Sequence, residues 1–225
     1  MEFRKYQSNI INKALEIINE KKFIYLSMEV RTGKTLTSLG ILDKIKNINK
    51  VLFITKKKAI TSIYKDFEML KPYYELLVIN YESLHKIDQR GWSAIICDES
   101  HSMGAFPKPS KRAKQVKELI IKNNPYVIFL SGTPTPESFS QMYHQVYGLI
   151  KSPFSKYTNF YKFAKDYVVP KTKRIGGFIV NDYSTGKQSI LDQMKPYTIS
   201  YTQREAGFKS KINEEIIYVN APDMS

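Results

Sequence analysis

Short, almost uninterrupted apolar runs alternate with stretches of helical periodicity through the first two thirds of the chain. Helices are predicted at residues 6–20, 34–46 and 111–121, with another ending near residue 70. The runs interpreted as strands are 23–27, 51–55, 75–80, 93–98 and 126–131. Strands without an apolar–polar alternation are typical of a parallel sheet covered by helices on both faces. We therefore predict an α/β fold whose ligand lies at the carboxyl ends of the strands.

The pattern changes after about residue 136. Residues 136–170 are rich in Tyr, Phe and Lys and are expected to be helical, whereas 171–196 contain three glycines and predict a loop or hairpin. Further strands are expected at 197–202 and 214–220. The chain is therefore expected to have three parts: an α/β unit at 1–140, a helical and loop insertion at 141–200, and a return strand to the first unit within 201–225.

The segment MEVRTGKT, residues 28–35, lies between a predicted strand and a predicted helix. That context suits a phosphate-binding loop, because successive backbone N–H groups and a helix N-terminus then face an anion. Gly33 would let the backbone approach the phosphates, Lys34 would reach them, and the Thr35 hydroxyl would ligate Mg²⁺. Met28 stands where the motif usually has its first glycine. The alternative is an ordinary turn between a strand and a helix.

Two adjacent carboxylates, Asp98 and Glu99, follow the apolar run SAIIC. Carboxylates at the end of a buried strand are unfavourable without a cation or a hydrogen-bond network. Mg²⁺ held by Asp98 would supply the cation, and Glu99 could then orient or deprotonate a water molecule. The alternative is a solvated strand end at which Asp98 caps the next turn.

An excess of basic residues suggests a polyanionic partner. Lys and Arg number 35 against 21 Asp and Glu, which gives a net charge of +14, and nucleic acid is the first partner to consider. The alternative is that the lysines only keep the surface soluble. A single cysteine, Cys97, excludes a disulfide within the chain, and no signal peptide or membrane span is visible. We expect no membrane partner and a cytoplasmic location, in a bacterial cell or a virus-infected host cell.

Taken together, these segments resemble the motifs of superfamily 2 helicases, and within them the Swi/Snf-type translocases. MEVRTGKT resembles motif I, DESH (98–101) the DEAD/DEAH box, and SGTPTP (131–136) motif III. FRKYQ (3–7) resembles the adenine-contacting segment, FITKKKAI (53–60) motif Ia, and VINYESL (78–84) motif Ib. The resemblance is firm over about residues 1–150. It implies a RecA-like ATP-binding lobe that uses ATP and Mg²⁺.

The resemblance also implies a role for each matching residue. The adenine side would be read by Gln7, with Arg4 and Tyr6 nearby. The phosphates would be wrapped by Arg31, Thr32, Gly33, Lys34 and Thr35. Mg²⁺ would be held by Thr35 and Asp98, and the catalytic residues would be Lys34 and Glu99. Arg31 stands where many relatives have a glycine.

Two further groups follow from the same resemblance. The nucleotide state would be coupled to the nucleic-acid site by His101, Ser131, Gly132 and Thr133. A bound strand would lie near Lys56, Lys57, Asn80 and Tyr81. The alternative for this second group is a solvated lysine cluster that caps a strand.

Motors of this superfamily need two RecA-like lobes, and the second supplies an arginine finger. No second phosphate-binding sheet and no Gly-Arg-x-x-Arg segment is visible after residue 140. We therefore expect a first lobe that moves on duplex DNA together with a second lobe, covalent or in trans, and hydrolyses ATP very slowly without it. Two alternatives stay open: an RNA helicase lobe, which the Gly-Thr-Pro of motif III disfavours, and a non-catalytic, nucleotide-gated DNA-binding module.

Overall fold

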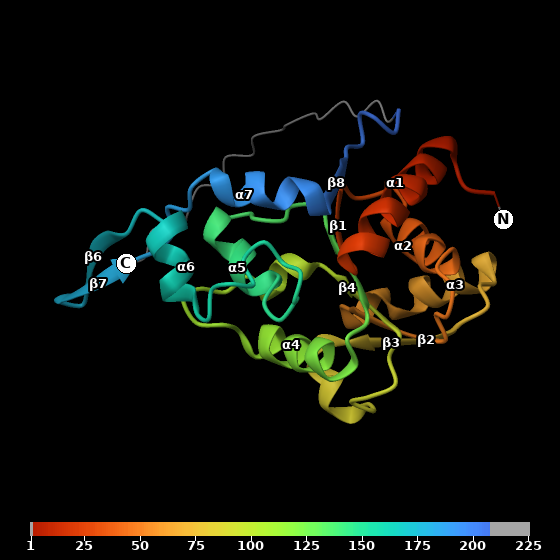
Figure 1. Cartoon of the computed structure of the whole chain (residues 1–225), viewed down its shortest axis with the longest axis horizontal. Coiled ribbons are helices and arrows are strands. Elements are labelled where there is room, and N and C mark those ends of the chain that lie inside the picture. Colours follow the sequence, from red (N-terminus) through yellow and green to blue (C-terminus); the bar gives the residue numbers. More distant parts are fainter. Residues whose placement is uncertain (1, 208–225) are drawn as a thin grey trace, which may run out of the picture.

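A six-stranded parallel sheet forms the centre of the molecule (Figure 1). The computed structural model describes residues 2–207. The strand order is β3-β2-β4-β5-β1-β8, and every neighbouring pair is parallel. The strands are β1 (Phe23–Met28), β2 (Lys50–Thr55), β3 (Glu75–Asn80), β4 (Ala94–Asp98), β5 (Tyr126–Ser131) and β8 (Thr198–Tyr201). The predicted RecA-like α/β class is confirmed.

Helices cover both faces of the sheet, as its apolar strands require. One face carries α1 (Lys5–Lys21), α2 (Lys34–Asp43) and α3 (Ile60–Leu70); the other carries α4 (Lys111–Asn123), α5 (Met142–Gln145), α6 (Phe160–Tyr167) and α7 (Ser189–Met194) (Figure 1). Successive side chains of β1 enter opposite cores: Ile24 and Leu26 pack under α1 and α2, whereas Tyr25 packs under α4 and α5. Each fully buried apolar side chain contributes about 1.5–3 kcal/mol.

The segment after residue 136 is less helical than its composition predicted. It contains only the 3-10 turn η4 (Phe139–Gln141) and the short helices α5 and α6 before residue 170. Gly148, at a φ of 98°, turns the chain after α5, and Asn159 caps the start of α6 through its side chain. The predicted hairpin is present as β6 (Lys171–Ile175) paired with β7 (Phe178–Asp182). Helix α2 also ends at Asp43, earlier than expected.

Aromatic side chains of this segment build the second core. Phe154, Phe160 and Phe163 are each at most 2 % exposed, and Phe163 packs against Tyr143 with ring centroids 4.8 Å apart. These three rings are therefore unavailable for stacking on nucleic-acid bases.

The chain then returns to the sheet. After α7 and the turn η5 (Lys195–Tyr197), strand β8 pairs in parallel with β1, with Ser27 opposite Ser200. The return strand thus begins three residues before position 201, where that part of the chain was expected to start. The other strand expected, at 214–220, lies outside the described residues. Within residues 2–207, no helix is long and apolar enough to cross a membrane.

Candidate active site

The loop between β1 and α2 has the conformation of an anion cradle. Arg31 and Gly33 both adopt left-handed backbone conformations, with φ of 64° and 74°, and Gly33 precedes the first turn of α2. For Arg31 such a conformation costs about 1 kcal/mol, so neighbouring contacts must hold it. Thr32 is fully buried, and its hydroxyl donates to the Glu29 carbonyl oxygen at 2.6 Å. The loop is thus a fixed structure that curls its backbone around the start of α2.

Helix α1 contacts this loop through its side chains. The Tyr6 hydroxyl donates to the Thr32 carbonyl oxygen at 3.1 Å, and the Gln7 side-chain oxygen, Oε1, accepts the Arg4 N–H at 3.0 Å. The Gln7 side-chain nitrogen lies only 2.5 Å from the point where a Cβ on Gly33 would sit. Glycine is therefore required at position 33 for two reasons: its backbone has a positive φ, and the Gln7 amide leaves no room for a Cβ. Of the three residues expected on the adenine side, Tyr6 and Gln7 contact the phosphate loop and Arg4 is bonded to Gln7, and their contact with adenine stays a prediction.

At the end of β4, Asp98 is held as a nearly buried carboxylate. It accepts the Thr55 hydroxyl at 2.8 Å and the Glu99 N–H at 3.0 Å. Burial raises the pKa of Asp98, and the neighbouring charge of Glu99 raises it further, while the Thr55 hydrogen bond and Lys34 oppose the rise. A carboxylate held in this way favours a cation as its next neighbour.

Glu99 points from this strand end toward the loop after β5. Its backbone is left-handed, with a φ of 50°, and its carboxylate lies 3.3 Å from His101 Nδ1 and 3.8 Å from Lys56 Nζ. His101 Nδ1 also lies 2.9 Å from the Ser131 hydroxyl oxygen, which accepts the Thr133 N–H at 3.2 Å. A continuous chain of polar contacts therefore joins the acidic pair to the turn at 131–133.

The phosphate loop, Glu99 and the turn after β5 meet at one cavity. Its volume is about 370 Å³, and its lining residues are Glu29, Val30, Lys34, Glu99, Gly132, Thr133 and Gln203. Lys34 Nζ lies 3.8 Å from the point where a Cβ on Gly132 would sit. The positive charge of Lys34 opposes the rise in the pKa of Asp98. Lys34, Glu99 and Gly132 thus lie around one cavity at the carboxyl ends of three strands, and the joint binding of a metal by Thr35 and Asp98 stays a prediction.

These residues fit a metal-bound nucleotide. The cradle offers backbone N–H groups and the Lys34 ammonium to phosphates, and Thr35 stands in the first turn of α2. Asp98 is a half-buried carboxylate that lacks a directly bonded cationic partner among residues 2–207. The described part of the chain contains no cluster of three His, Cys, Asp or Glu side chains that could hold a metal alone. A Mg²⁺ here would therefore share its ligands between Thr35, Asp98 and the phosphates.

Of the four residues expected near a nucleic-acid strand, some lie on the surface and one is buried. Lys56 and Lys57 are exposed at the end of β2, although Lys56 approaches Glu99. Asn80 donates to the Glu82 carboxylate at 2.9 Å on the surface. Tyr81 requires a correction: it is 2 % exposed, and its hydroxyl donates to the Asp98 carbonyl oxygen at 2.7 Å. Its ring completes the core beneath the acidic pair and cannot contact a bound strand.

Several supporting residues were not identified from the sequence. The buried Tyr25 hydroxyl accepts the Ser100 hydroxyl and donates to Gln145 Oε1, both at 2.7 Å. Gln145 Nε2 donates in turn to the Pro134 carbonyl oxygen at 2.7 Å. This relay is a second link between the DESH segment and the turn after β5. Nothing in the local sequence marks it, because its four members lie on four separate segments of the chain.

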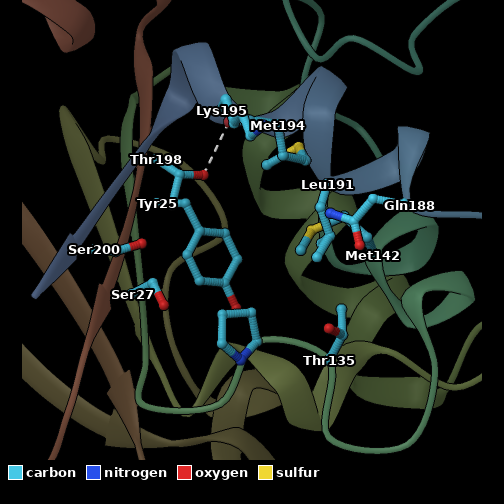
Figure 2. Close-up of a pocket in the computed structure, with 11 residues that line it drawn as sticks. Tyr25, Ser27, Thr135, Met142, Gln188, Leu191, Met194, Lys195, Thr198 and Ser200 are labelled. Atoms are coloured by element: carbon cyan, nitrogen blue, oxygen red, sulfur yellow. Dashed lines mark hydrogen bonds between the residues drawn. The ribbon is translucent and has the colours of Figure 1, made fainter. Parts of the chain in front are cut away.

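A second cavity, of about 330 Å³, lies beside that relay (Figure 2). Figure 2 shows the Tyr25 ring reaching into it from β1, with Leu191 and Met194 of α7 on the opposite side. The Thr198 hydroxyl donates to the Met194 carbonyl oxygen at 2.9 Å, which ties α7 to β8. None of the lining residues carries a carboxylate, so this cavity is not a second site for the acid–base chemistry described above.

Comparison with known proteins gives the fold and site a family. The family model for SNF2-related domains matches residues 48–222, and the model for the res subunit of type III restriction enzymes matches residues 1–75. No curated protein matches the sequence.

Solved structures agree with this assignment at the level of the fold. The Sulfolobus solfataricus SWI2/SNF2 ATPase core in complex with dsDNA is similar at a TM-score of 0.70 and 17% identity, over 92% of this chain and 46% of that one. The core domain of the same organism gives 0.66 and 17%, over 89% and 43%. The Pyrococcus furiosus Hef helicase domain gives 0.51 and 19%, over 65% and 36%. The chain therefore spans less than half the length of these structures. The match over residues 48–222 shows that the chain belongs to the SNF2-related domain family.

Proposed function

We propose that the chain is the ATP-binding first motor lobe of a DNA translocase. The observation that carries this proposal is the single cavity at which Lys34, Glu99 and the turn at Gly132 and Thr133 meet. A phosphate-binding lysine and a carboxylate suited to activating water are there brought to one place by three different strand ends.

Each residue then has a defined task. Lys34 and the N–H groups of the loop bind the β- and γ-phosphates, and Gln7 reads the adenine edge beside Arg4 and Tyr6. Thr35 and Asp98 would hold Mg²⁺, which neutralises charge on the transferred phosphoryl group. Glu99 orients the attacking water and accepts its proton while the bond to ADP breaks. When ATP is hydrolysed, the contacts of Glu99 change, and His101 and Ser131 transmit that change to the turn after β5.

Hydrolysis by this lobe alone is proposed to be very slow. An arginine contributed by a second lobe is worth about 10³–10⁵ in rate in phosphoryl-transfer enzymes of this kind. The test is steady-state ATP turnover with and without duplex DNA, for this chain alone and for the same chain fused to a second RecA-like lobe. Glu99→Gln in the fusion should retain ATP binding and lose turnover. Rapid, DNA-stimulated turnover by the pure isolated chain would contradict the need for a second lobe.

Duplex DNA is the proposed track. The net charge of +14 favours a polyanion, and the most similar of the solved structures described above was determined with dsDNA. Binding should weaken steeply as salt increases, because lysines displace condensed counterions. The measurement is the affinity for matched DNA and RNA duplexes over a series of salt concentrations. Tighter binding to duplex RNA would favour an RNA helicase lobe instead.

A further inference from the structure

The phosphate loop is also held from its outer side, by a segment almost at the opposite end of the described chain. Directly after β8, residues Thr202–Glu205 turn across the end of β1, which lies beside β8 in Figure 1. The Glu29 N–H donates to the Tyr201 carbonyl oxygen at 3.0 Å, and the Gln203 N–H donates to the Glu29 carboxylate at 2.7 Å. The sheet pairing of β8 with β1 is thereby continued into the phosphate loop.

Gln203 makes the decisive contact with its side chain. Its Nε2 donates to the Val30 carbonyl oxygen at 3.0 Å, inside the loop that curls around the phosphate position. Gln203 also lines the cavity that Lys34 and Glu99 line. It therefore touches the loop backbone and faces the space expected to hold the terminal phosphate.

The turn that presents Gln203 is itself well ordered by polar contacts. The Glu205 carboxylate accepts the Thr202 N–H at 2.7 Å and the Thr202 hydroxyl at 2.8 Å. The Tyr201 ring stacks on Tyr6 of α1, with centroids 4.8 Å apart and planes at 13°. Because Tyr6 also holds Thr32, the two supports of the loop, from α1 and from the segment after β8, are joined to each other.

The backbone of the loop explains why such support is needed. Arg31 occupies a position where glycine would be the unstrained choice, because its φ is 64°. A non-glycine residue keeps that conformation only when surrounding contacts over-determine it. The Val30 carbonyl oxygen, one residue before Arg31, is the atom that Gln203 holds.

We propose that Gln203 is a positioning residue for the phosphate loop, and that it also forms the outer wall of the nucleotide cavity. The inference rests on the proposed function, because it assumes that this cavity binds ATP. It predicts that the hydrogen-bond donor at position 203 sets the affinity for ATP without being needed for folding.

Three variants test this. Gln203→Glu keeps the size of the side chain but removes the donor and adds a negative charge beside the phosphates, whereas Gln203→Lys retains an N–H donor. Gln115→Glu makes the same change on α4, away from the cavity. The measurements are the dissociation constants for MgATP and MgADP and the thermal midpoint of the nucleotide-free protein.

Gln203→Glu should weaken MgATP binding about tenfold, the equivalent of about 1.4 kcal/mol, and should weaken MgADP less. Its midpoint should match that of Gln115→Glu, and Gln203→Lys should bind MgATP nearly as well as the unaltered protein. Equal MgATP affinity in Gln203→Glu and the unaltered protein would overturn the inference, as would an equal loss in Gln115→Glu or in Gln203→Lys. Failure of the unaltered protein to bind MgATP would instead refute the proposed function.

Discussion

The two halves of the nucleotide cavity are stabilised in different ways. The phosphate loop after β1 has left-handed residues and depends on side chains far away in the chain, at Tyr6 and Gln203. The acidic pair after β4 depends on the neighbouring strand and the turn beneath it, through Thr55 and Tyr81. The comparison teaches that one half is a strained loop held by distant supports, whereas the other is a buried charge held by its immediate surroundings.

The largest expected effect is on the phosphate loop. Lys34→Ala should raise the dissociation constant for ATP about 100-fold, because charge-assisted hydrogen bonds to two phosphates are lost. Lys46→Ala, an exposed lysine beyond α2, is the matched control and should leave affinity unchanged. The measurement is titration calorimetry with MgATP. Equal affinity in both variants would show that the loop does not bind phosphate.

Replacing the loop glycine separates conformational strain from steric conflict. Gly33→Ala should weaken ATP binding about tenfold or more, for two reasons. The new Cβ would clash with the Gln7 amide, and alanine is strained at the positive φ of this position. Gly91→Ala is the control: its φ is 92°, but nothing lies within 4 Å of the new Cβ. It should lower stability by about 1 kcal/mol without changing ATP affinity. Similar ATP affinities in the two variants would contradict the contact with Gln7.

In the acidic half of the cavity, we expect a single substitution to raise the stability of the protein while it weakens MgATP binding. Asp98→Asn removes a buried charge, so the nucleotide-free protein should unfold at a temperature higher by roughly 2–4 °C at neutral pH. The same change should weaken MgATP binding about tenfold, through loss of a metal ligand. Thermal unfolding and calorimetry measure the two effects. An unchanged affinity for ATP with Mg²⁺ present would show that Asp98 is not a ligand of the metal.

The pKa of Asp98 adds a pH dependence with a definite sign. Because the pKa is raised above its usual 3.8, the folded state binds the proton more tightly than the unfolded state. Stability should therefore fall as pH rises from the usual pKa through the raised one, and Asp98→Asn should abolish that slope. MgATP binding should change the other way, weakening as the pH falls and the carboxylate becomes protonated. The comparison is of unfolding midpoints and affinities over a pH series.

The smallest expected effect concerns the support beneath the acidic pair. Tyr81→Phe removes the hydrogen bond to the Asp98 carbonyl oxygen and should lower stability by about 1 kcal/mol, with little change in ATP affinity. Tyr73→Phe is the control, because Tyr73 also donates to a backbone carbonyl, that of Ile45, but is 61% exposed. Denaturant unfolding distinguishes the two. A loss of DNA binding without loss of stability in Tyr81→Phe would favour a surface role for Tyr81.

Local periodicity was enough to determine the sheet and the strand ends of this protein. Continuous apolar runs such as 51–55 and 126–131, alternating with helices, are typical of a parallel sheet buried on both faces, and parallel strands bring their carboxyl ends to one edge. That rule alone placed Lys34, Asp98 and Ser131 near one another. The weakly helical segment 141–170 was harder, because short helices packed through aromatic rings leave little periodic signal.

What only the tertiary structure decided is which distant residues support that edge. Position 203 reaches position 29 because β8 lies next to β1, and the order of strands in a sheet is not encoded by the periodicity of any one of them. The burial of Tyr81, which the resemblance had placed at a nucleic-acid surface, and the raised pKa of Asp98 have the same origin. Both depend on how closely neighbouring elements pack around a side chain and exclude water, a property of the assembled fold rather than of the local chain.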